Sequence, residues 1–297
     1  MPIDSDLQER LRRVLGALEM LLPRHLAPID WRETHAAVWR RHLLAGYLEP
    51  LPAGVTVRLP DLLGIDEQKR VVERNTRQFL AGLPANNVLL WGTRGTGKSS
   101  LVRALLGSLA GEGLRVIQVD RDDLVQLPAI VEAVRGEPYR FLVFSDDVSF
   151  EVGESSYKTL KSALDGSVFS APENVLIYVT SNRRHMLPEF ETDNLGALIH
   201  NQEIHHGEAV EEKISLSGRF GLWVGFHSFS RAQYLSVARQ WAERLAARAG
   251  GAVGWTPEAE AAAVEWALRK GDQSGRIALQ FATHWVGSRM LEAREAG

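Results

Sequence analysis

The stretch GTRGTGKS at residues 92–99 constrains the fold of this chain more than any other feature. An apolar run, NVLLW at 87–91, precedes it and predicts a strand, and the run after it predicts a helix over 98–110. The stretch matches G-x-x-x-x-G-K-[ST]. Glycines in that pattern let backbone N–H groups point at a phosphate chain, and the helix adds the positive end of its dipole. The sequence therefore predicts a phosphate-binding loop between a strand and a helix.

The pattern predicts a role for the side chains and the backbone of this loop. Lys98 is expected to reach the β- and γ-phosphates of a nucleotide, and the Ser99 hydroxyl is expected to reach Mg²⁺. The residues expected to hold the nucleotide are Gly92, Thr93, Arg94, Gly95, Thr96, Gly97, Lys98, Ser99 and Ser100. Phosphate binding alone leaves kinase, GTPase and ATPase open.

A pair of adjacent aspartates favours hydrolysis over transfer to an organic acceptor. The apolar run RFLVFS at 140–145 predicts a strand, and Asp146 and Asp147 follow it directly. Asp146 is expected to hold Mg²⁺. Asp147 is expected either to orient and polarise an attacking water or to cap the following turn.

Three more polar residues complete the predicted site. The run VLIYVT at 175–180 predicts another strand, and Asn182 follows it at the strand end where ligands sit in parallel sheets. Arg219 precedes the last helical region, and Arg276 lies inside it. A guanidinium can reach a γ-phosphate from a neighbouring subunit or from a lid, or it can form a surface salt bridge.

The patterns along the chain predict three zones, which are 1–60, 61–227 and 228–297. The first is expected to be helical, with an apolar face that continues through Trp31, Val38, Trp39 and Leu43. The second alternates apolar strands with helices and predicts a parallel α/β sheet covered on both faces. Its remaining elements are a strand at 115–120 and helices at 122–135 and 155–165.

The third zone, 228–297, predicts a helical lid with recognisable helix ends. Ser230 and Gln233 form a capping box before one helix. Thr256 is an N-cap residue before Pro257, and Gly271 ends the helix that these residues begin.

Composition excludes several classes of function. The chain has no cysteine, which excludes thiolate catalysis and cysteine-ligated zinc. Its net charge of -3 gives no global argument for binding nucleic acid or anionic lipid. No apolar run approaches the ~20 residues that a membrane helix needs. These features predict a soluble, cytoplasmic protein with no membrane partner.

The order of these motifs resembles that of AAA+ ATPases over residues 61–297. Walker A is GTRGTGKS, Walker B is FLVFSDD, sensor 1 is TSN, the arginine-finger candidate is SGRF, and sensor 2 is SGR in the lid. The stretches DDVSFEVGESSYKTLKSALDGS, IYVTSNRRHMLPE and GEAVEEKISLSGRFGLW further resemble a bacterial AAA+ family catalogued only as domain of unknown function eight-fifteen.

The resemblance implies ATP and Mg²⁺ as ligands, hydrolysis of ATP, and a homo-oligomer. It implies that Leu63, Gly64 and Ile65 pack against adenine, and that Arg219 acts on the ATP of a neighbouring subunit. It also implies a protein or nucleic-acid partner whose identity the motifs do not supply.

The chain departs from the AAA+ pattern at two places. AAA+ enzymes that thread a polypeptide through a pore carry an aromatic residue in the corresponding loop. The stretch VDRDDLVQLP at 119–128 has no aromatic residue, which argues against an unfoldase. Walker B ends in Asp-Asp, as in the bacterial initiator and helicase-loader branch. The leading interpretation is an ATPase that remodels or loads a macromolecular partner. A slow nucleotide-dependent switch or scaffold is the alternative, and a small-molecule kinase fits the motifs less well.

Overall fold

The computed structural model describes residues 8–14, 28–41, 46–52, 57–149, 155–165, 172–182, 198–200, 203–205 and 216–295. Its main sheet has seven described strands in the order β2-β1-β4-β5-β6-β3-β9. The strands are β1 (Ala36–Arg41), β2 (Gly46–Pro50), β3 (Val88–Gly92), β4 (Leu114–Gln118), β5 (Arg140–Ser145), β6 (Val175–Ser181) and β9 (Leu222–Phe226). Every neighbouring pair is parallel except β1 with β2. The predicted parallel α/β sheet is confirmed.

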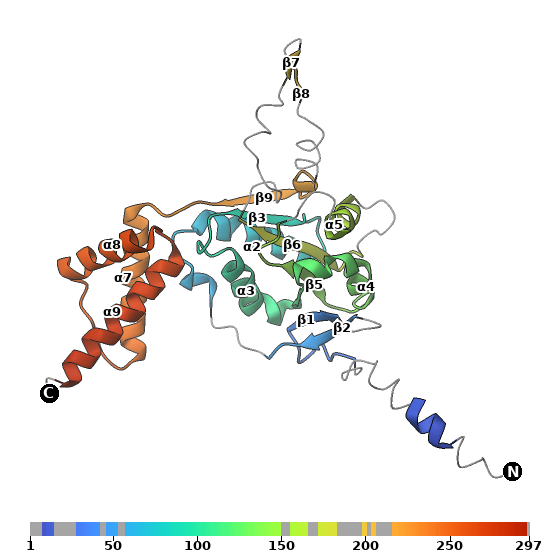
Figure 1. The fold of residues 1–297 in the computed structure, drawn as a ribbon, viewed down its shortest axis with the longest axis horizontal. Helices are drawn as coiled ribbons and strands as arrows, with labels where there is room; N and C mark the ends of the chain where they lie inside the picture. Colours follow the sequence, from blue (N-terminus) through green and yellow to red (C-terminus); the bar gives the residue numbers. More distant parts are fainter. Residues whose placement is uncertain are drawn as a thin grey trace.

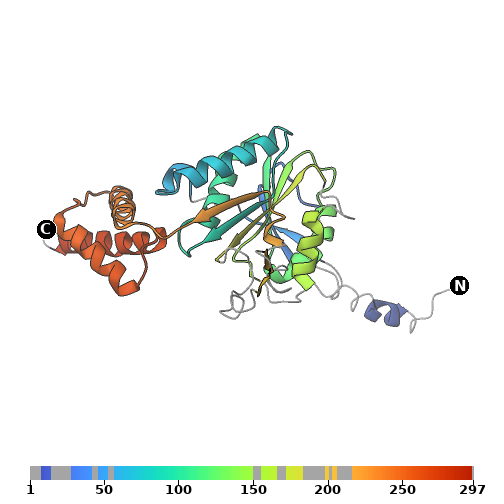
Figure 2. The same ribbon diagram turned by 90° about the horizontal axis from the view of Figure 1, so that it is seen from above.

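Helices cover both faces of this sheet (Figures 1 and 2). The helices are α2 (Asp66–Leu80) and α3 (Lys98–Leu109) on one face, and α4 (Leu127–Glu132) and α5 (Ser155–Asp165) on the other. Along β3, Val88 and Leu90 are buried in the core that contains α2 and α3, whereas Leu89 is buried in the opposite core. This alternation explains why the strands read as continuous apolar runs, because both of their faces are covered.

The helix predicted over 122–135 is shorter and begins later than expected. Residues Arg121–Gln126 form the 3-10 helix η3, and α4 starts only at Leu127. Pro128 occupies the first turn of α4, where its missing N–H is tolerated. An α-helix that ran through 122–135 would lose a backbone hydrogen bond at this proline.

The N-terminal zone corrects the prediction of a helical face, because Trp31 lies in a turn and Val38 and Trp39 lie in a strand. These two residues lie in β1, which pairs in parallel with β4 and antiparallel with β2. Pairing with β2 and β4 overrides the weak local preference of this segment, because it satisfies backbone groups and buries both side chains. Residues 8–14 are helical as expected, and Leu43 lies outside the described residues.

Strand β9 was not predicted, although it determines where the last helices begin. It pairs in parallel with β3 and forms one edge of the sheet. The Thr93 N–H donates to the Phe226 carbonyl at 2.9 Å, so β9 ends beside the start of the glycine-rich loop at 92–99. The chain therefore passes from β9 directly to the helices next to that loop (Figure 1).

The C-terminal zone is helical as predicted, and its helix ends are those read from the sequence. Its helices are α7 (Arg231–Arg248), α8 (Pro257–Lys270) and α9 (Gly275–Glu295). Ser230 Oγ and Thr256 Oγ1 each accept a backbone N–H at 3.3 Å as N-caps. Gly271 ends α8 with φ of 64°. The three helices pack together at one side of the sheet (Figure 2).

Two further features belong to the described fold. A separate antiparallel pair is formed by β7 (Leu198–His200) and β8 (Glu203–His205). None of the described helices combines the length and the apolar character that crossing a bilayer requires. The zone boundaries 1–60, 61–227 and 228–297 remain predictions.

Candidate nucleotide-binding site

The stretch GTRGTGKS forms a tight turn between β3 and α3. Its three glycines, Gly92, Gly95 and Gly97, have φ angles of 122°, 77° and 107°. A Cβ atom on Gly92 would lie 2.0 Å from the Phe226 carbonyl oxygen. Glycine is required here because L side chains rarely adopt these angles and because β9 approaches the loop so closely. The loop and helix predicted at this position are confirmed.

Lys98 begins α3 and turns its ammonium group back over the loop. Its Nζ donates to the carbonyl oxygens of Gly92 at 2.7 Å and Thr93 at 2.8 Å, and to Asn182 Oδ1 at 3.3 Å. Burial lowers the pKa of Lys98 to about 8, although the carboxylates of Asp147 and Asp146 oppose that shift. Lys98 is thus a cation held at the loop by neutral oxygen atoms, and the nearby carboxylates offset only part of the cost of its burial.

Ser99 and Asp146 lie in contact across the end of the sheet. Ser99 Oγ donates to Asp146 Oδ1 at 2.5 Å, and Thr180 Oγ1 donates to the same carboxylate oxygen at 2.5 Å. A hydroxyl and an exposed carboxylate are the oxygen ligands that Mg²⁺ takes beside a nucleotide. The donor set therefore fits the metal that the sequence predicted.

Asp147 is held in an unusual backbone conformation. Its φ of 52° is the one positive value among the described residues other than glycine. Its N–H donates to Thr180 Oγ1 at 2.8 Å, its carboxylate accepts from Asn182 Nδ2, and Arg94 Nη2 lies 3.4 Å from Asp147 Oδ2. Strained residues of this kind cluster at functional sites, and this one directs its carboxylate toward the loop.

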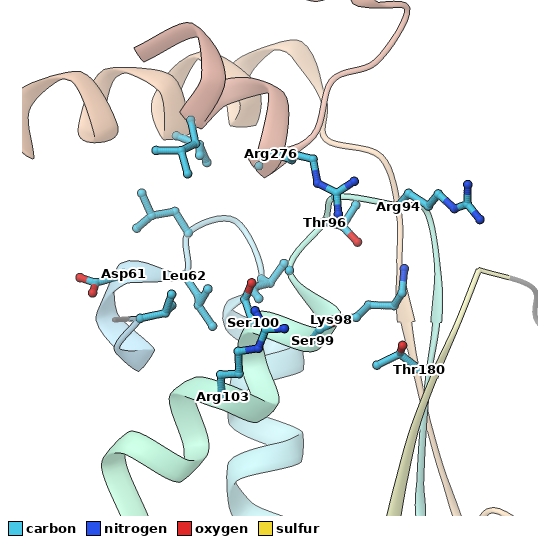
Figure 3. Close-up of a pocket in the computed structure, with 18 of the residues that line it drawn as sticks. Asp61, Leu62, Arg94, Thr96, Lys98, Ser99, Ser100, Arg103, Thr180 and Arg276 are labelled. Carbon is cyan, nitrogen blue, oxygen red and sulfur yellow. The ribbon is translucent and has the colours of Figure 1, made fainter. Parts of the chain in front are cut away.

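These groups line one cavity of about 630 Å³. One end carries Lys98, Asp146, Asp147 and Asn182, and the lining at the other end is largely apolar. Figure 3 shows the Lys98 side chain extending from the start of α3 to a position above Thr180, and Arg276 reaching toward Thr96 from above the loop. The volume is within the range of small-molecule sites, and a charged end beside an apolar end suits a nucleotide.

The cavity includes most of the residues predicted from the sequence. Leu63 and Ile65 line its apolar end, and Arg94 through Ser100 line its charged end. Gly64, Gly92 and Thr93 are not in its wall. Arg219 lies elsewhere, in the turn before β9, and its N–H bonds to the Leu216 carbonyl at 3.1 Å.

Sequence reasoning missed several residues of the cavity wall. They are Val57, Asp61, Leu62, Arg103, Thr180, Phe229, Val237, Trp241, Gly275 and Leu279. Most come from the C-terminal helices or from the segment before α2. Their apolar spacing indicates helices, but it does not indicate which helical face meets the loop. Thr180 carries a signal that was available, since it is the last residue of the predicted strand VLIYVT, two positions before Asn182.

The C-terminal helices are fixed to the loop and to the segment before α2. The Arg276 N–H donates to the Gly95 carbonyl at 3.1 Å, so the start of α9 sits directly on the loop. Arg244 Nη1 lies 2.8 Å from Asp61 Oδ1 in the 3-10 helix η1 (Leu59–Asp61). Burial raises the pKa of Asp61, but hydrogen bonds from Arg58 and the charge of Arg244 together hold it below its usual value. The cavity is therefore closed on one side by a lid with specific polar contacts.

The sheet, the loop and the C-terminal helices together have the arrangement of the AAA+ fold. The chain belongs to the family described as "Protein of unknown function (DUF815)", whose model matches residues 32–289. No curated protein matches the chain.

Solved structures of AAA+ proteins show the same fold at low sequence identity. The FIGL-1 AAA domain in complex with ADP has a TM-score of 0.52 at 18% identity, over 80% of this chain and 75% of that one. The Aeropyrum pernix Orc1 protein in complex with DNA has a TM-score of 0.52 at 16% identity, over 81% and 63%. A mutant of Thermotoga maritima RuvB has a TM-score of 0.51 at 15% identity, over 76% and 64%. This chain thus spans less than two thirds of the RuvB and Orc1 chains.

Proposed function

We propose that this protein binds ATP with Mg²⁺ in the cavity beneath the lid and hydrolyses it to remodel or load a macromolecular partner. The observation that supports this most strongly is the convergence of Lys98, Ser99 and Asp146 at one end of a cavity whose other end is largely apolar. The charged end suits a triphosphate and its metal, and the apolar end suits a purine base.

Each polar group has a distinct part in this proposal. The Ser99 hydroxyl and the Asp146 carboxylate hold Mg²⁺, which when bound supplies positive charge to the β- and γ-phosphate oxygens. Lys98 exchanges its carbonyl partners for those phosphates. Asp147 orients the attacking water and accepts its proton, while Asn182 fixes the position of that carboxylate.

The segment after β4 supports remodelling without threading of a polypeptide. Trp39 Nε1 donates to Gln126 Oε1 at 2.6 Å. Arg41 lies 2.6 Å from Asp123 Oδ1 and donates to the Asp122 carbonyl at 2.7 Å. Strand β1 therefore holds this segment in place, and the segment has no aromatic side chain to grip a substrate. A partner that is loaded or switched fits these features better than one that is unfolded.

A slow ATP-dependent switch or scaffold is the second candidate, and the same site would serve it. The Asp-Asp pair favours it, because the shorter aspartate side chain places the base farther from a γ-phosphate than glutamate would. Measuring ATP turnover with and without DNA, RNA and candidate proteins separates the two. Stimulation supports remodelling, and constant slow turnover supports the switch. Affinity capture on the Asp147→Asn variant with ATP present is the way to identify the partner.

We expect Lys98→Ala to weaken binding of ATP·Mg²⁺ by roughly 10–100-fold, the loss typical of a hydrogen-bonded charge. Calorimetric titration measures this affinity, and circular dichroism confirms that the variant is folded. Equal affinity of the folded variant and the wild type would contradict the proposed site.

The same cation predicts how ATP affinity depends on pH. Phosphates stabilise the ammonium form, so binding raises the pKa of Lys98 above its value of about 8 in the free protein. Affinity should therefore be constant below about pH 8 and fall by up to about tenfold per pH unit above it. Titrations of the wild type and Lys98→Ala across this range test the point, because the variant should lack the decline. A decline of equal slope in both proteins would assign the dependence to another group.

A further inference from the structure

Arg103 is a cation of the cavity wall that no sequence motif singled out. It lies on α3 and lines the cavity near Ser100 and Leu62. Its side chain is exposed, and within the described part of the chain it makes no ion pair or hydrogen bond with another residue. Most other exposed arginines near the cavity have an acidic partner, as Arg58 has in Asp61 and Arg94 has in Asp147.

The geometry of α3 places the Arg103 guanidinium near the first turn of this helix. Side chains on an α-helix lean toward its N-terminus, and residues three and four positions apart lie on the same face. Arg103 follows Ser100 by three positions and Ser99 by four. Figure 3 shows the Arg103 side chain running back along α3 so that its guanidinium lies beside Ser100.

This position falls between the two ends of the cavity. Lys98 and Asp146 mark the end that suits terminal phosphates, and Leu62 and Ile65 mark the end that suits a base. A nucleotide that spans both ends brings its first phosphate past the start of α3, where Ser100 and Arg103 lie. Arg276 approaches from the lid, on the opposite side of the loop (Figure 3).

We infer that Arg103 binds the α-phosphate of the nucleotide, an inference that rests on the proposed ATP site. A guanidinium matches phosphate in charge and in the geometry of its donors. The α-phosphate is common to ATP and ADP, so Arg103 should contribute to the affinity of both without distinguishing them. Arg103 is then a binding residue that holds the nucleotide before and after hydrolysis, in contrast to residues at the γ-phosphate.

The test compares ATP and ADP affinities of Arg103→Ala, Arg103→Lys and the matched control Arg74→Ala. Arg74 is an exposed arginine of α2 outside the cavity wall. We expect Arg103→Ala to weaken ATP and ADP by the same factor, roughly 10–100-fold. Arg103→Lys should recover most of the affinity because it keeps the charge, and Arg74→Ala should match the wild type.

Alanine is a strong helix former at an exposed position, so Arg103→Ala should keep α3 intact, as circular dichroism can verify. Unchanged affinities in Arg103→Ala would overturn the inference, and so would a loss confined to ATP, which would move Arg103 to the γ-phosphate. Equal losses in Arg103→Ala and Arg103→Lys would show that charge is not the cause and would also overturn it. If the wild type bound no nucleotide, the proposed function itself would fail. If Lys98→Ala weakened binding and Arg103→Ala did not, only this inference would fail.

Discussion

Replacing Arg219 with alanine should leave ATP affinity unchanged and slow phosphate release by roughly 10³–10⁵-fold, the effect that an arginine finger has in well-studied GTPases. Arg219 precedes β9, and β9 begins where the Leu222 N–H bonds the Asn87 carbonyl, at the start of β3. The glycine-rich loop at 92–99 follows the opposite end of β3. Arg219 therefore lies at the far end of the sheet from the cavity of its own chain, and we propose that it serves the cavity of a neighbouring subunit.

A mixing experiment separates this action between subunits from a structural role. Arg219→Ala lacks the finger and Lys98→Ala lacks the phosphate contact, so each variant alone should be inactive. In mixed assemblies formed at random from equal amounts, about a quarter of interfaces would pair an intact loop with an intact finger. Phosphate release should then recover to a similar fraction of the wild-type rate. Arg74→Ala is the control for the loss of an exposed arginine.

Subunit exchange has to be demonstrated with labelled protein before the mixture is interpreted. If exchange is complete and activity does not recover, Arg219 acts within its own chain or only on folding. The proposal of an obligate homo-oligomer would then lose its main support. Normal phosphate release by Arg219→Ala alone would contradict the finger assignment directly.

Asp147→Asn should bind ATP·Mg²⁺ as the wild type does and hydrolyse it about 10²–10⁴-fold more slowly, the usual cost of losing a general base. Asparagine is nearly the same size and tolerates positive φ, so the backbone at φ of 52° should be preserved. The amide cannot accept the proton of an attacking water. Binding is measured by calorimetry and hydrolysis by phosphate release.

The neighbouring aspartate provides the matched control for this variant. Asp146→Asn removes the carboxylate that contacts Ser99, so its defect should depend on the Mg²⁺ concentration. The defect of Asp147→Asn should be the same at every Mg²⁺ concentration. Phosphate release at the wild-type rate in Asp147→Asn would show that Asp147 is structural and that another group activates the water.

The sequence predicted the covered part of the sheet more accurately than its edges. The strand at 140–145 and the helix at 155–165 have the predicted bounds, because a strand buried on both faces gives a continuous apolar run. The strands at the sheet edge and next to it give weaker signals. β1 contains alanine and arginine, which suit a helix equally well, and it becomes a strand because it pairs with β4. β9 contains Gly225, which weakens a strand pattern.

The charged end of the site could be predicted, whereas the apolar end could not. The loop 92–99 is one continuous stretch of sequence, and Asp146 and Asp147 are adjacent residues. The chemistry of each can therefore be recognised from the sequence alone. Phe229 and Trp241 reach the cavity only because the lid packs against the loop. Arg103 belongs to the site because of the direction of its side chain on α3, which no short motif encodes.

The conversion of bound ATP to ADP in a single turnover tests the central claim most directly. Wild-type protein in excess over labelled ATP is incubated with Mg²⁺ and sampled over time, beside Lys98→Ala and a reaction without metal. The account predicts that ADP and phosphate form in the wild type, that their formation requires Mg²⁺, and that Lys98→Ala forms little of either. ATP that stays bound and intact on the wild type, or ADP that forms at the same rate on Lys98→Ala, would contradict it.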